Sequence, residues 1–533
     1  MSFTSVGFIC FLVITVLLYY LFPKKHQWKL LLAASLFFYF CAGKWYLPYI
    51  LFTAISSWVI SLIMNRNMIA EKSYIEQNKE KMDKDARKAY KARQKKKRFY
   101  ILIVGLVLNF GILAVLKYTG FTVNNINSII HIFSEDTSLT VPSLILPMGI
   151  SFYTFQTMGY LIDVYRGKTT HEKNIARFLL FVSFFPQLVQ GPISRHSDLS
   201  DQLYCGHSAK WDNIAPAMLR IAYGFFKKLV IADTVMIAIK SIMSSPERYN
   251  GVYVLFLILA YSAQIYADFT GGIDITIGIG EMLGIKIKEN FDHPFSATST
   301  KEYWRRWHIT MGTWFQDYIF YPLSICKPMQ KLSKWSRAKL GNALGKRIPV
   351  YLATIVTWFT TGLWHGASWN FIVWGLLNCA VILISQELQP LYAKFHNKFP
   401  SLDGNYVYTL FCRGRTFFLM GLIRILDCYR DVPLTFRCVG SMFYDFSSWG
   451  EFFSGGVLDL GVGIKEYIVV ALAIISVCII SKYQRAEGVS LRHKIAERPA
   501  LTFACLAVLT VVIIIFGSYG IGYDASGFIY NQF

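Results

Sequence analysis

Long apolar runs alternate with shorter polar or basic segments along the whole of this sequence. About 20 consecutive apolar residues are enough for a helix to cross a bilayer. The pattern therefore predicts an all-α, polytopic integral membrane protein with roughly 11 or more transmembrane helices. The expected spans are residues 5–22, 29–43, 46–64, 99–117, 142–163, 250–270, 349–365, 368–388, 405–427, 465–482 and 500–518.

Two apolar stretches carry residues that break helices. Residues 178–191 contain Pro186 and lead into Gly191-Pro192, and residues 271–284 are rich in glycine. Irregular backbone at membrane depth survives only where protein or a water-filled cavity surrounds it. We therefore expect re-entrant segments around a central cavity or tunnel, within a single transmembrane domain covering residues 1–533.

Composition and charge turn this pattern into a topology. The chain is 54% hydrophobic with a mean hydropathy of +0.39, which is too apolar for an ordinary soluble domain. Its net charge of +22 is concentrated near Lys24 and in the stretches 66–98, 325–348 and 482–498. Because basic loops of multispanning proteins stay in the cytoplasm, these segments are expected inside and both termini outside.

The basic stretch 66–98 is expected to be a solvated helical loop near anionic lipid headgroups, and no nucleic-acid partner is expected. None of the ten cysteines belongs to a CxxC pair. They are therefore interpreted as small buried hydrophobes, with no disulfide and no metal site.

The stretch 303–371 concentrates the ionisable and aromatic residues that need an explanation. Residues 303–321 are predicted to form a helix with two different faces. The three- and four-residue spacing gives one face Trp304, Trp307, Met311, Trp314, Tyr318 and Tyr321. The other face carries Arg306, Thr310, Thr313 and Asp317. His308 and His365 lie among these tryptophans, and ionisable groups at membrane depth are rarely kept without a partner or a task. A structural hydrogen bond is the alternative interpretation of each histidine.

The usual motifs of soluble enzymes are absent: the sequence has no glycine-rich phosphate loop, no nucleophile elbow and no HExxH. Several longer motifs are present instead, and they occur in order along the chain. They are Leu146–Tyr153 (LPMGISFY), Ile162–Gly167 (IDVYRG), Phe184–Gln187 (FFPQ), Gly191-Pro192, Gly224–Lys228 (GFFKK), Tyr266–Gly271 (YADFTG), Trp304–His308 (WRRWH) and Leu363–Ala367 (LWHGA).

Together these motifs resemble the membrane-bound O-acyltransferase (MBOAT) family, in its alginate O-acetyltransferase-type branch. The resemblance implies that His365 is the catalytic residue and that His308 is an associated site residue. Within the domain it places a catalytic core at 142–390 and C-terminal helices with an extracellular tail at 405–533. The chain departs from the family after Pro322 and lacks the aromatic-arginine segment expected near 415–430, which leaves the loop geometry and the polymer substrate open.

The resemblance further implies acetyl-CoA as the donor on the cytoplasmic side, with no bound cofactor, and an extracellular polysaccharide as the acceptor. Arg305 and Arg306 are candidates for the donor phosphates, although snorkelling at the interface would equally explain them. Asp268 is a candidate for fixing a histidine tautomer or pairing with an arginine. The remaining candidates for contact with substrate or donor are Trp304, Trp307, Trp364 and Asn370.

The final residues, Phe528–Phe533, resemble tyrosine-bearing segments of the same branch and of a small partner in D-alanylation. This suggests Tyr530 as an acyl relay to an extracellular partner similar to SGNH esterases. An aromatic membrane anchor is the alternative.

The resemblance implies the bacterial cytoplasmic (inner) membrane. D-alanyl transfer to teichoic acid from a carrier protein remains an alternative function, and so do a transporter and a scaffold.

Overall fold

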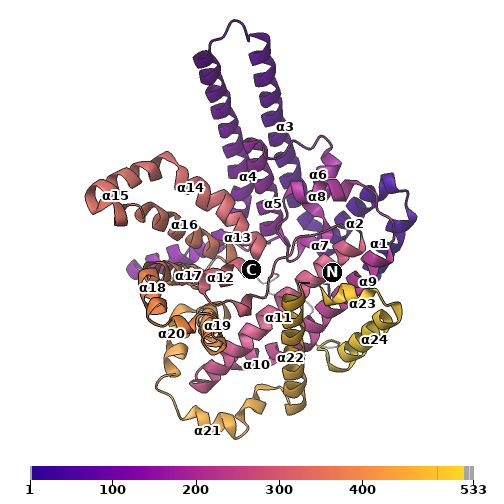
Figure 1. Ribbon diagram of the computed structural model, residues 1–533, viewed down its shortest axis with the longest axis vertical. Coiled ribbons are helices and arrows are strands. Elements are labelled where there is room, and N and C mark those ends of the chain that lie inside the picture. Colours follow the sequence, from indigo (N-terminus) through magenta and orange to yellow (C-terminus); the bar gives the residue numbers. More distant parts are fainter. Residues whose placement is uncertain (1–2, 489, 521–526, 528–533) are drawn as a thin grey trace. The chain divides into compact units, whose positions relative to one another are not determined.

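The computed structural model describes residues 3–488, 490–520 and 527. Within them every regular element is a helix, apart from a β-bridge between Phe291 and Trp307 (Figure 1). The predicted all-α class is confirmed. The chain divides into two compact units, of which one comprises Met1–Asn213 with Ile279–Ile287 and the other Ile214–Gly278 with Lys288–Phe533.

The first unit contains most of the apolar runs predicted in the N-terminal part of the chain. Its helices are α1 (Val6–Leu21), α2 (Gln27–Ala42), α3 (Leu47–Gln77), α4 (Lys84–Phe133), α5 (Ile150–Arg166), α6 (Ile175–Ser183), α7 (Phe185–Leu188) and α8 (His196–Tyr204). Helices α1, α2 and α7 share an aromatic core in which the Phe8, Phe38 and Phe185 rings pack together. The apolar residues of these runs thus face one another as well as the outside.

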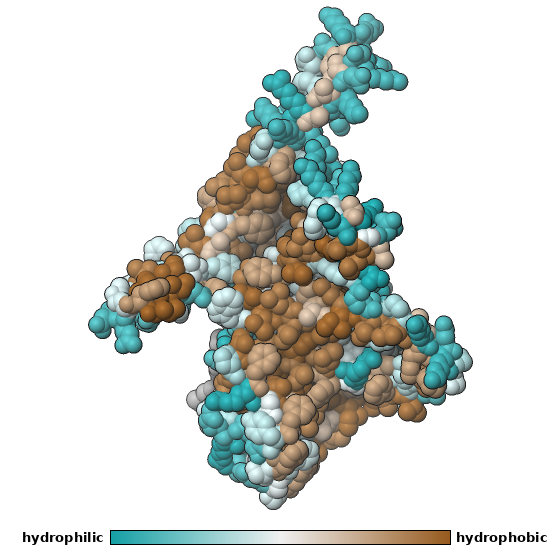
Figure 2. All heavy atoms as spheres, turned by 90° about the vertical axis from the view of Figure 1, so that its left-hand side faces the viewer, coloured by the Kyte–Doolittle hydropathy of each residue, from teal (hydrophilic) through white to brown (hydrophobic). Residues whose placement is uncertain are grey.

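Helices α3 and α4 form a long hairpin that continues past their apolar parts (Figure 1). The Tyr74 and Tyr90 rings stack at 4.6 Å, and Asn67 Nδ2 donates to Gln94 Oε1 at 2.8 Å. Figure 2 shows that the projecting end is covered by hydrophilic side chains, while apolar side chains cover the helices below it. The basic stretch 66–98 is therefore helical except for the turn between α3 and α4, and its cytoplasmic placement remains a prediction.

The chain around α7 has the broken backbone that the sequence predicted. Helix α6 ends at Ser183, α7 is a single turn, and the peptide between Gly191 and Pro192 is cis. All residues from Phe178 to Gln190 except Leu179 are buried, and Gln187 Nε2 donates to Ser194 Oγ at 2.7 Å. Protein therefore surrounds this irregular segment.

The second unit holds both histidines of the predicted site. Its main helices are α9 (Trp211–Phe226), α10 (Asp233–Ser244), α11 (Val252–Met282), α12 (Thr300–Arg306), α13 (Ile309–Phe315), α14 (Tyr321–Ile325), α15 (Lys327–Gly345), α16 (Ile348–His365), α17 (Trp369–Glu387), α18 (Gln389–Lys398), α19 (Tyr406–Tyr429), α20 (Val432–Ser441), α21 (Ser448–Phe453), α22 (Ile464–Glu487), α23 (Leu491–Ala496) and α24 (Pro499–Phe516). Two segments with wider π-helical turns, η3 (Lys227–Ala232) and η5 (Gln316–Phe320), lie among them.

The expectation of irregular backbone at residues 271–284 is wrong, because α11 continues through these glycines to Met282. A Cβ at Gly271 would lie 2.8 Å from the Gly224 carbonyl oxygen, and one at Gly278 would lie 3.1 Å from that of Ala217. The glycines thus let α9 and α11 approach closely, as small residues do between membrane helices.

The single amphipathic helix expected over residues 303–321 is also wrong. Helix α12 ends at Arg306, α13 begins at Ile309, and the π-helical η5 follows from Gln316. The residues expected on one helix face are therefore divided among α12, the break, α13, η5 and α14. Hydrogen bonds to Asn290, which precedes the break by 18 residues, stabilise this break and are described below.

Six helices of the described residues are long and apolar enough to cross a membrane. They lie at Lys44–Gln77, Lys84–Phe133, Val252–Met282, Trp369–Glu387, Ile464–Ala486 and Pro499–Phe516, and the shorter apolar helix Val6–Leu21 joins them.

Candidate active site

His308 occupies the break between α12 and α13 and is fully buried. Its backbone is left-handed, with φ 48° and ψ 53°. Such a conformation costs a residue other than glycine on the order of 1–3 kcal/mol, so the surroundings must impose it. Burial holds the pKa of His308 well below its usual value, and a positive charge on His365 would lower it further. The imidazole is therefore neutral at pH 7.

Asn290 holds this turn through both its backbone and its side chain. Its carbonyl accepts from the Ile309 N–H at 3.0 Å. Its amide oxygen Oδ1 accepts from Thr310 N–H at 3.0 Å and from Thr310 Oγ1 at 2.9 Å, and it lies 3.2 Å from Nδ1 of His308. The bridge between Phe291 and Trp307 continues the same pairing. A short extended segment thus fixes where the His308 ring lies.

His365 is the last residue of α16, and the packing of α16 on α17 sets its position. A Cβ at Gly375 would lie 2.5 Å from the Trp358 carbonyl oxygen and 3.2 Å from Gly362, so only small residues allow this crossing. The His365 ring packs edge-on against Trp374 of α17 at 4.7 Å between ring centroids. A side chain at Gly366 would collide with Phe371, which explains the glycine after the histidine.

Both histidines pack against the ring of Trp364. Its ring centroid lies 5.8 Å from that of His308 and 5.0 Å from that of His365. The two histidines come from separate motifs, and folding brings both of them to one buried indole. Two imidazoles in an aromatic enclosure can take and return a proton without bulk water.

The other two tryptophans of the first motif form walls of this region. Trp304 donates from Nε1 to Asn378 Oδ1 at 3.2 Å and packs edge-on against Trp358 and Trp374. Trp307 lies under the guanidinium of Arg424, whose Cζ is 4.3 Å from the ring centroid. Arg424 also donates to the Tyr303 hydroxyl. Helix α19 therefore supplies a buried cation next to the His308 turn, from the part of the chain where the sequence shows no aromatic-arginine motif.

Asn370 and Asp268 contact other groups than a histidine. Asn370 is buried and donates from Nδ2 to the Leu426 carbonyl at 3.1 Å, which ties α17 to α19. Asp268 is fully buried and pairs with Lys228 at 2.6 Å. Asn290 is the residue whose side chain lies against Nδ1 of His308. Asp268 still lies near the site, because its neighbour Phe269 packs edge-on against His308 at 4.9 Å.

The two candidate donor-binding arginines, at the end of α12, differ in exposure. Arg305 is exposed. Arg306 forms an ion pair with Glu302 at 2.7 Å and donates to Ser296 Oγ at 3.2 Å. Arg306 thus has an intramolecular carboxylate partner, and a role for either residue in binding a phosphate remains a prediction.

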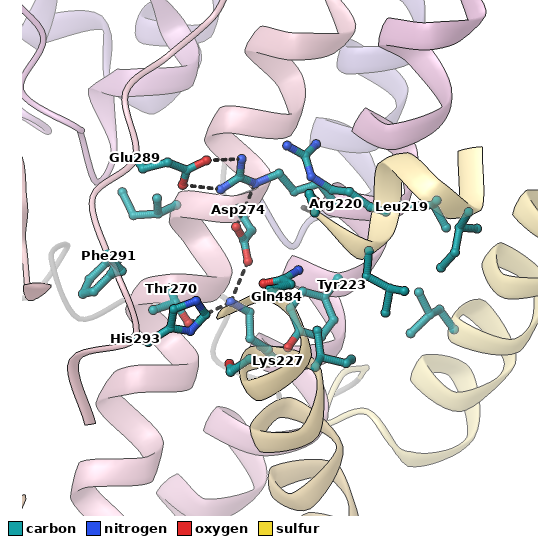
Figure 3. A pocket seen from close by; sticks show the side chains of 18 of the residues that line it. Leu219, Arg220, Tyr223, Lys227, Thr270, Asp274, Glu289, Phe291, His293 and Gln484 are labelled. Atoms are coloured by element: carbon teal, nitrogen blue, oxygen red, sulfur yellow. Dashed lines mark hydrogen bonds and ion pairs between the residues drawn. The ribbon is translucent and has the colours of Figure 1, made fainter. Parts of the chain in front are cut away.

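A cavity of about 940 Å³ opens beside the Asn290 segment, wholly within the second unit (Figure 3). Ile309, the residue after His308, lines it together with Phe291 and Asp292. Apolar side chains of α24 form the opposite wall, and Gln484 and Arg492 belong to its border. The cavity is therefore large enough for an extended small molecule and lies against the turn that carries His308.

A network of charged side chains, buried or nearly so except for Glu289, lines one side of this cavity (Figure 3). Arg220 makes two parallel hydrogen bonds to Glu289, at 2.6 and 2.7 Å, and a third to Asp274 at 2.8 Å. Lys227, in the π-helical turn η3, donates to Asp274 at 2.6 Å and to Thr270 at 2.8 Å. The Arg220–Glu289 pair anchors the extended segment beside Asn290, so this network also supports the His308 turn.

Residues 170–337 match the model of the membrane-bound O-acyltransferase family. The chain is 31% identical over 408 residues to a peptidoglycan O-acetyltransferase of Helicobacter pylori, an alignment covering 72% of this chain and 68% of that protein. The chain belongs to the membrane-bound O-acyltransferase family. It is also 36% identical over 288 residues to an Azotobacter vinelandii protein named "Probable alginate O-acetylase AlgI", covering 54% of each. A teichoic acid D-alanyltransferase of Bacillus subtilis is 26% identical over 267 residues, covering 49% of this chain and 64% of that protein.

These similarities confirm the predicted family and its alginate O-acetyltransferase-type branch. The chain spans about half the length of the alginate relatives it matches. The matched family segment contains His308 and Asn290 and ends before His365. Within the described residues no group of three or more His, Cys, Asp or Glu side chains is placed to hold a metal ion.

Three residues of this site were missed by sequence reasoning: Asn290, Lys228 and Arg424. Lys228 stands in the GFFKK motif, and a lysine between apolar residues is a signal for a buried carboxylate partner. Asn290 and Arg424 have no such signal, because their partners are 18 or more residues away and no periodicity joins them. Tyr530, the candidate relay, lies outside the described residues.

Proposed function

We propose that this protein moves an acetyl group from cytoplasmic acyl-CoA across the membrane for O-acetylation of an extracellular polysaccharide. His365 is the general base. It takes the proton from the attacking hydroxyl as the new C–O bond forms and the thioester C–S bond breaks, and the leaving thiolate takes up that proton. General-base assistance of this kind contributes about 100- to 10,000-fold to a rate.

The observation that carries the proposal is that His308 and His365 both pack against the ring of buried Trp364. A structural hydrogen-bonding role would not require two distant motifs to converge on one enclosure. Family membership supports the same reaction class, and the relatives named for alginate and peptidoglycan O-acetylation support a polysaccharide acceptor.

The cavity of about 940 Å³ is the proposed donor site. Gln484 and Arg492, which line the cavity, belong to the basic stretch 482–498. The positive-inside rule assigns that stretch to the cytoplasm. A donor entering there would bring its thioester to the wall formed by Ile309, next to His308. This arrangement supports a donor from the cytoplasmic side.

The membrane architecture follows from the same reasoning. We place the chain in the bacterial cytoplasmic (inner) membrane, with roughly 11 or more crossings and re-entrant segments around a tunnel, as one transmembrane domain. Six long apolar helices and one shorter helix support a multi-pass arrangement. The stretch 66–98 is then cytoplasmic and both termini are outside.

Cysteine labelling in intact cells tests this topology. The test uses a variant from which the other accessible cysteines have been removed. In it, Tyr90→Cys is expected to react with an impermeant maleimide only after the cells are permeabilised. Asn125→Cys, at the other end of α4, is expected to react with an impermeant maleimide from outside. Reversed labelling would overturn the inside-outside assignment.

The acyl group is proposed to reach its acceptor through Tyr530 and an extracellular SGNH-esterase-like partner. A phenol has a pKa near 10, below that of an alkyl alcohol, so an acyl-tyrosine keeps much of the transfer potential of a thioester. The carbonyl of Gly527, three positions before Tyr530, accepts from Lys228 Nζ at 2.9 Å. Lys228 pairs with Asp268, next to the Phe269 ring that packs on His308. These contacts support a relay in this part of the chain.

Tyr530→Phe keeps the aromatic ring and removes only the hydroxyl. We expect it to abolish acetylation of the polymer at equal expression, because no oxygen remains to carry the acyl group. An aromatic anchor would tolerate this change, so full polymer acetylation in Tyr530→Phe would exclude the relay. Tyr519→Phe, on an exposed tyrosine of the same part of the chain, is the matched control.

One assay separates the candidate functions. Membranes containing the protein and its partner receive labelled acetyl-CoA with and without extracellular polysaccharide, and label in the polymer is counted. Label that depends on this protein supports O-acetylation. Label from a D-alanyl carrier protein alone would support the teichoic acid reaction instead, which the 26%-identical relative makes the second candidate. Label from neither donor would leave a transporter or a scaffold.

A further inference from the structure

The hydrogen-bonding partners of Asn290 determine which nitrogen of His308 carries the proton. A backbone N–H can only donate, so the side-chain atom 3.0 Å from Thr310 N must be the amide oxygen of Asn290. The same oxygen lies 3.2 Å from Nδ1 of His308. An unprotonated Nδ1 would direct its lone pair at that oxygen, so Nδ1 carries the hydrogen. In the neutral ring the lone pair is then on Nε2.

We propose that Asn290 is a positioning residue that holds His308 in the Nδ1–H tautomer, so that His308 supports acyl transfer as a hydrogen-bond acceptor at Nε2. This rests on the proposed function and decides between two roles for His308. A group that polarises the thioester carbonyl must donate a hydrogen, and neutral His308 has none at Nε2. A lone pair there can only accept a hydrogen bond or a proton, so His308 acts by receiving one during the transfer.

Two further features agree with this assignment. The left-handed backbone of His308 directs its ring at Asn290, and the hydrogen bond from Ile309 N to the Asn290 carbonyl maintains that turn. The ring is fully buried, and removal from water disfavours the imidazolium that would place hydrogens on both nitrogens. Structure on both sides of the histidine thus favours the same tautomer.

The tautomer can be measured without relying on activity. The protein is labelled with ¹⁵N-histidine, and the His308 signals are assigned by difference from His308→Gln, with His308→Asn as a second variant. We expect a protonated Nδ1 and an unprotonated Nε2 in the wild type, with the tautomer mixed or reversed in Asn290→Leu. A protonated Nε2 in the wild type would overturn the proposal, whether or not the protein proves to transfer acetyl groups.

Activity then tests the role. The glutamine side chain in His308→Gln can present either an N–H or a carbonyl oxygen near the former Nε2 position, but it has no basic nitrogen. This variant is therefore expected to lose as much activity as His308→Ala. Retention of most activity by His308→Gln would show that no basic nitrogen is needed at this position, and would contradict the role of the Nε2 lone pair. If wild-type membranes transfer no label at all, the proposed function fails while the tautomer result still stands.

Variants of Asn290 separate positioning from packing. Asn290→Leu is expected to lower transfer on the order of 10- to 100-fold, as when the partner orienting an active-site imidazole is removed. Asn290→Asp keeps an acceptor facing Nδ1, so it should restore most activity. Its negative charge favours the imidazolium, so the acidic limb of the pH–rate profile should move to higher pH.

Asn109→Leu, on another buried asparagine whose hydrogen bonds reach Ser56 and the Gly105 carbonyl, is the matched control. A purely structural Asn290 would leave the pH profile of Asn290→Asp unchanged. That result would overturn the positioning role.

Discussion

His365→Ala is expected to reduce acetyl transfer to the polymer by about 100- to 10,000-fold, the contribution of a general base. The methyl group of alanine cannot take the proton of the attacking hydroxyl, and the other imidazole of the site, His308, is held in its own position by Asn290. The protein should still insert and fold, because the close approach of α16 and α17 at Gly362 and Gly375 remains when the contact between the His365 and Trp374 rings is lost. Transfer of label from acetyl-CoA, normalised to protein in the membrane, is the measurement.

The control for this variant is another histidine in the same unit. His396 in α18 is partly exposed, its Nδ1 lies 2.6 Å from Asp403 Oδ1, and it belongs to neither of the two histidine motifs. His396→Ala should therefore transfer label at the wild-type rate. If well-expressed His365→Ala acetylates the polymer normally, His365 is not the base, and the convergence of the two histidines on Trp364 needs a structural explanation.

The length of an apolar run predicted a helix well where the helix satisfies its backbone hydrogen bonds internally. The runs at 5–22, 349–365 and 368–388 became α1, α16 and α17 within a few residues, since a helix in an apolar environment must satisfy all its backbone groups internally. The glycines of α11 were misread for a related reason. In water, glycine weakens a helix, but here it permits contact with α9, and that contact cannot be seen in a single sequence.

The residues of the candidate site that belong to sequence motifs could be predicted, and those that reach it through tertiary contacts could not. The two histidines and their tryptophans were found, and folding places His308 and His365 around Trp364. The break at His308 was not found, because the aromatic residues from 303 to 321 keep the three- and four-residue spacing of one helix face without interruption. The turn exists because Asn290 supplies hydrogen bonds from outside that helix, and such a tertiary contact overrides local periodicity.

Lys228→Met is expected to be the most destabilising single change in the second unit. Lys228 Nζ lies 2.6 Å from Asp268 and 2.8 Å from Asp233, and the exposed side-chain fractions are 1%, 0% and 10%. Removing the lysine takes the ammonium away from two neighbouring carboxylates in a buried place. Breaking a buried pair in this way costs about 3–5 kcal/mol, because the remaining charge loses its partner without regaining water.

Thermal unfolding in detergent measures this loss, and the double variant Lys228→Met/Asp268→Leu tests its cause. The double variant also removes one of the two carboxylates, so it should melt above Lys228→Met although it differs more from the wild type. Arg248→Met is the control, because its pair with Glu451 is more than half exposed on both sides and contributes about 0–1 kcal/mol. Lys228 also holds the Gly527 carbonyl, so the single variant should lose polymer acetylation even at temperatures where it stays folded. A Lys228→Met protein that melts with the wild type would mean that water or a proton already compensates these carboxylates, and that the ion pair does not stabilise the fold.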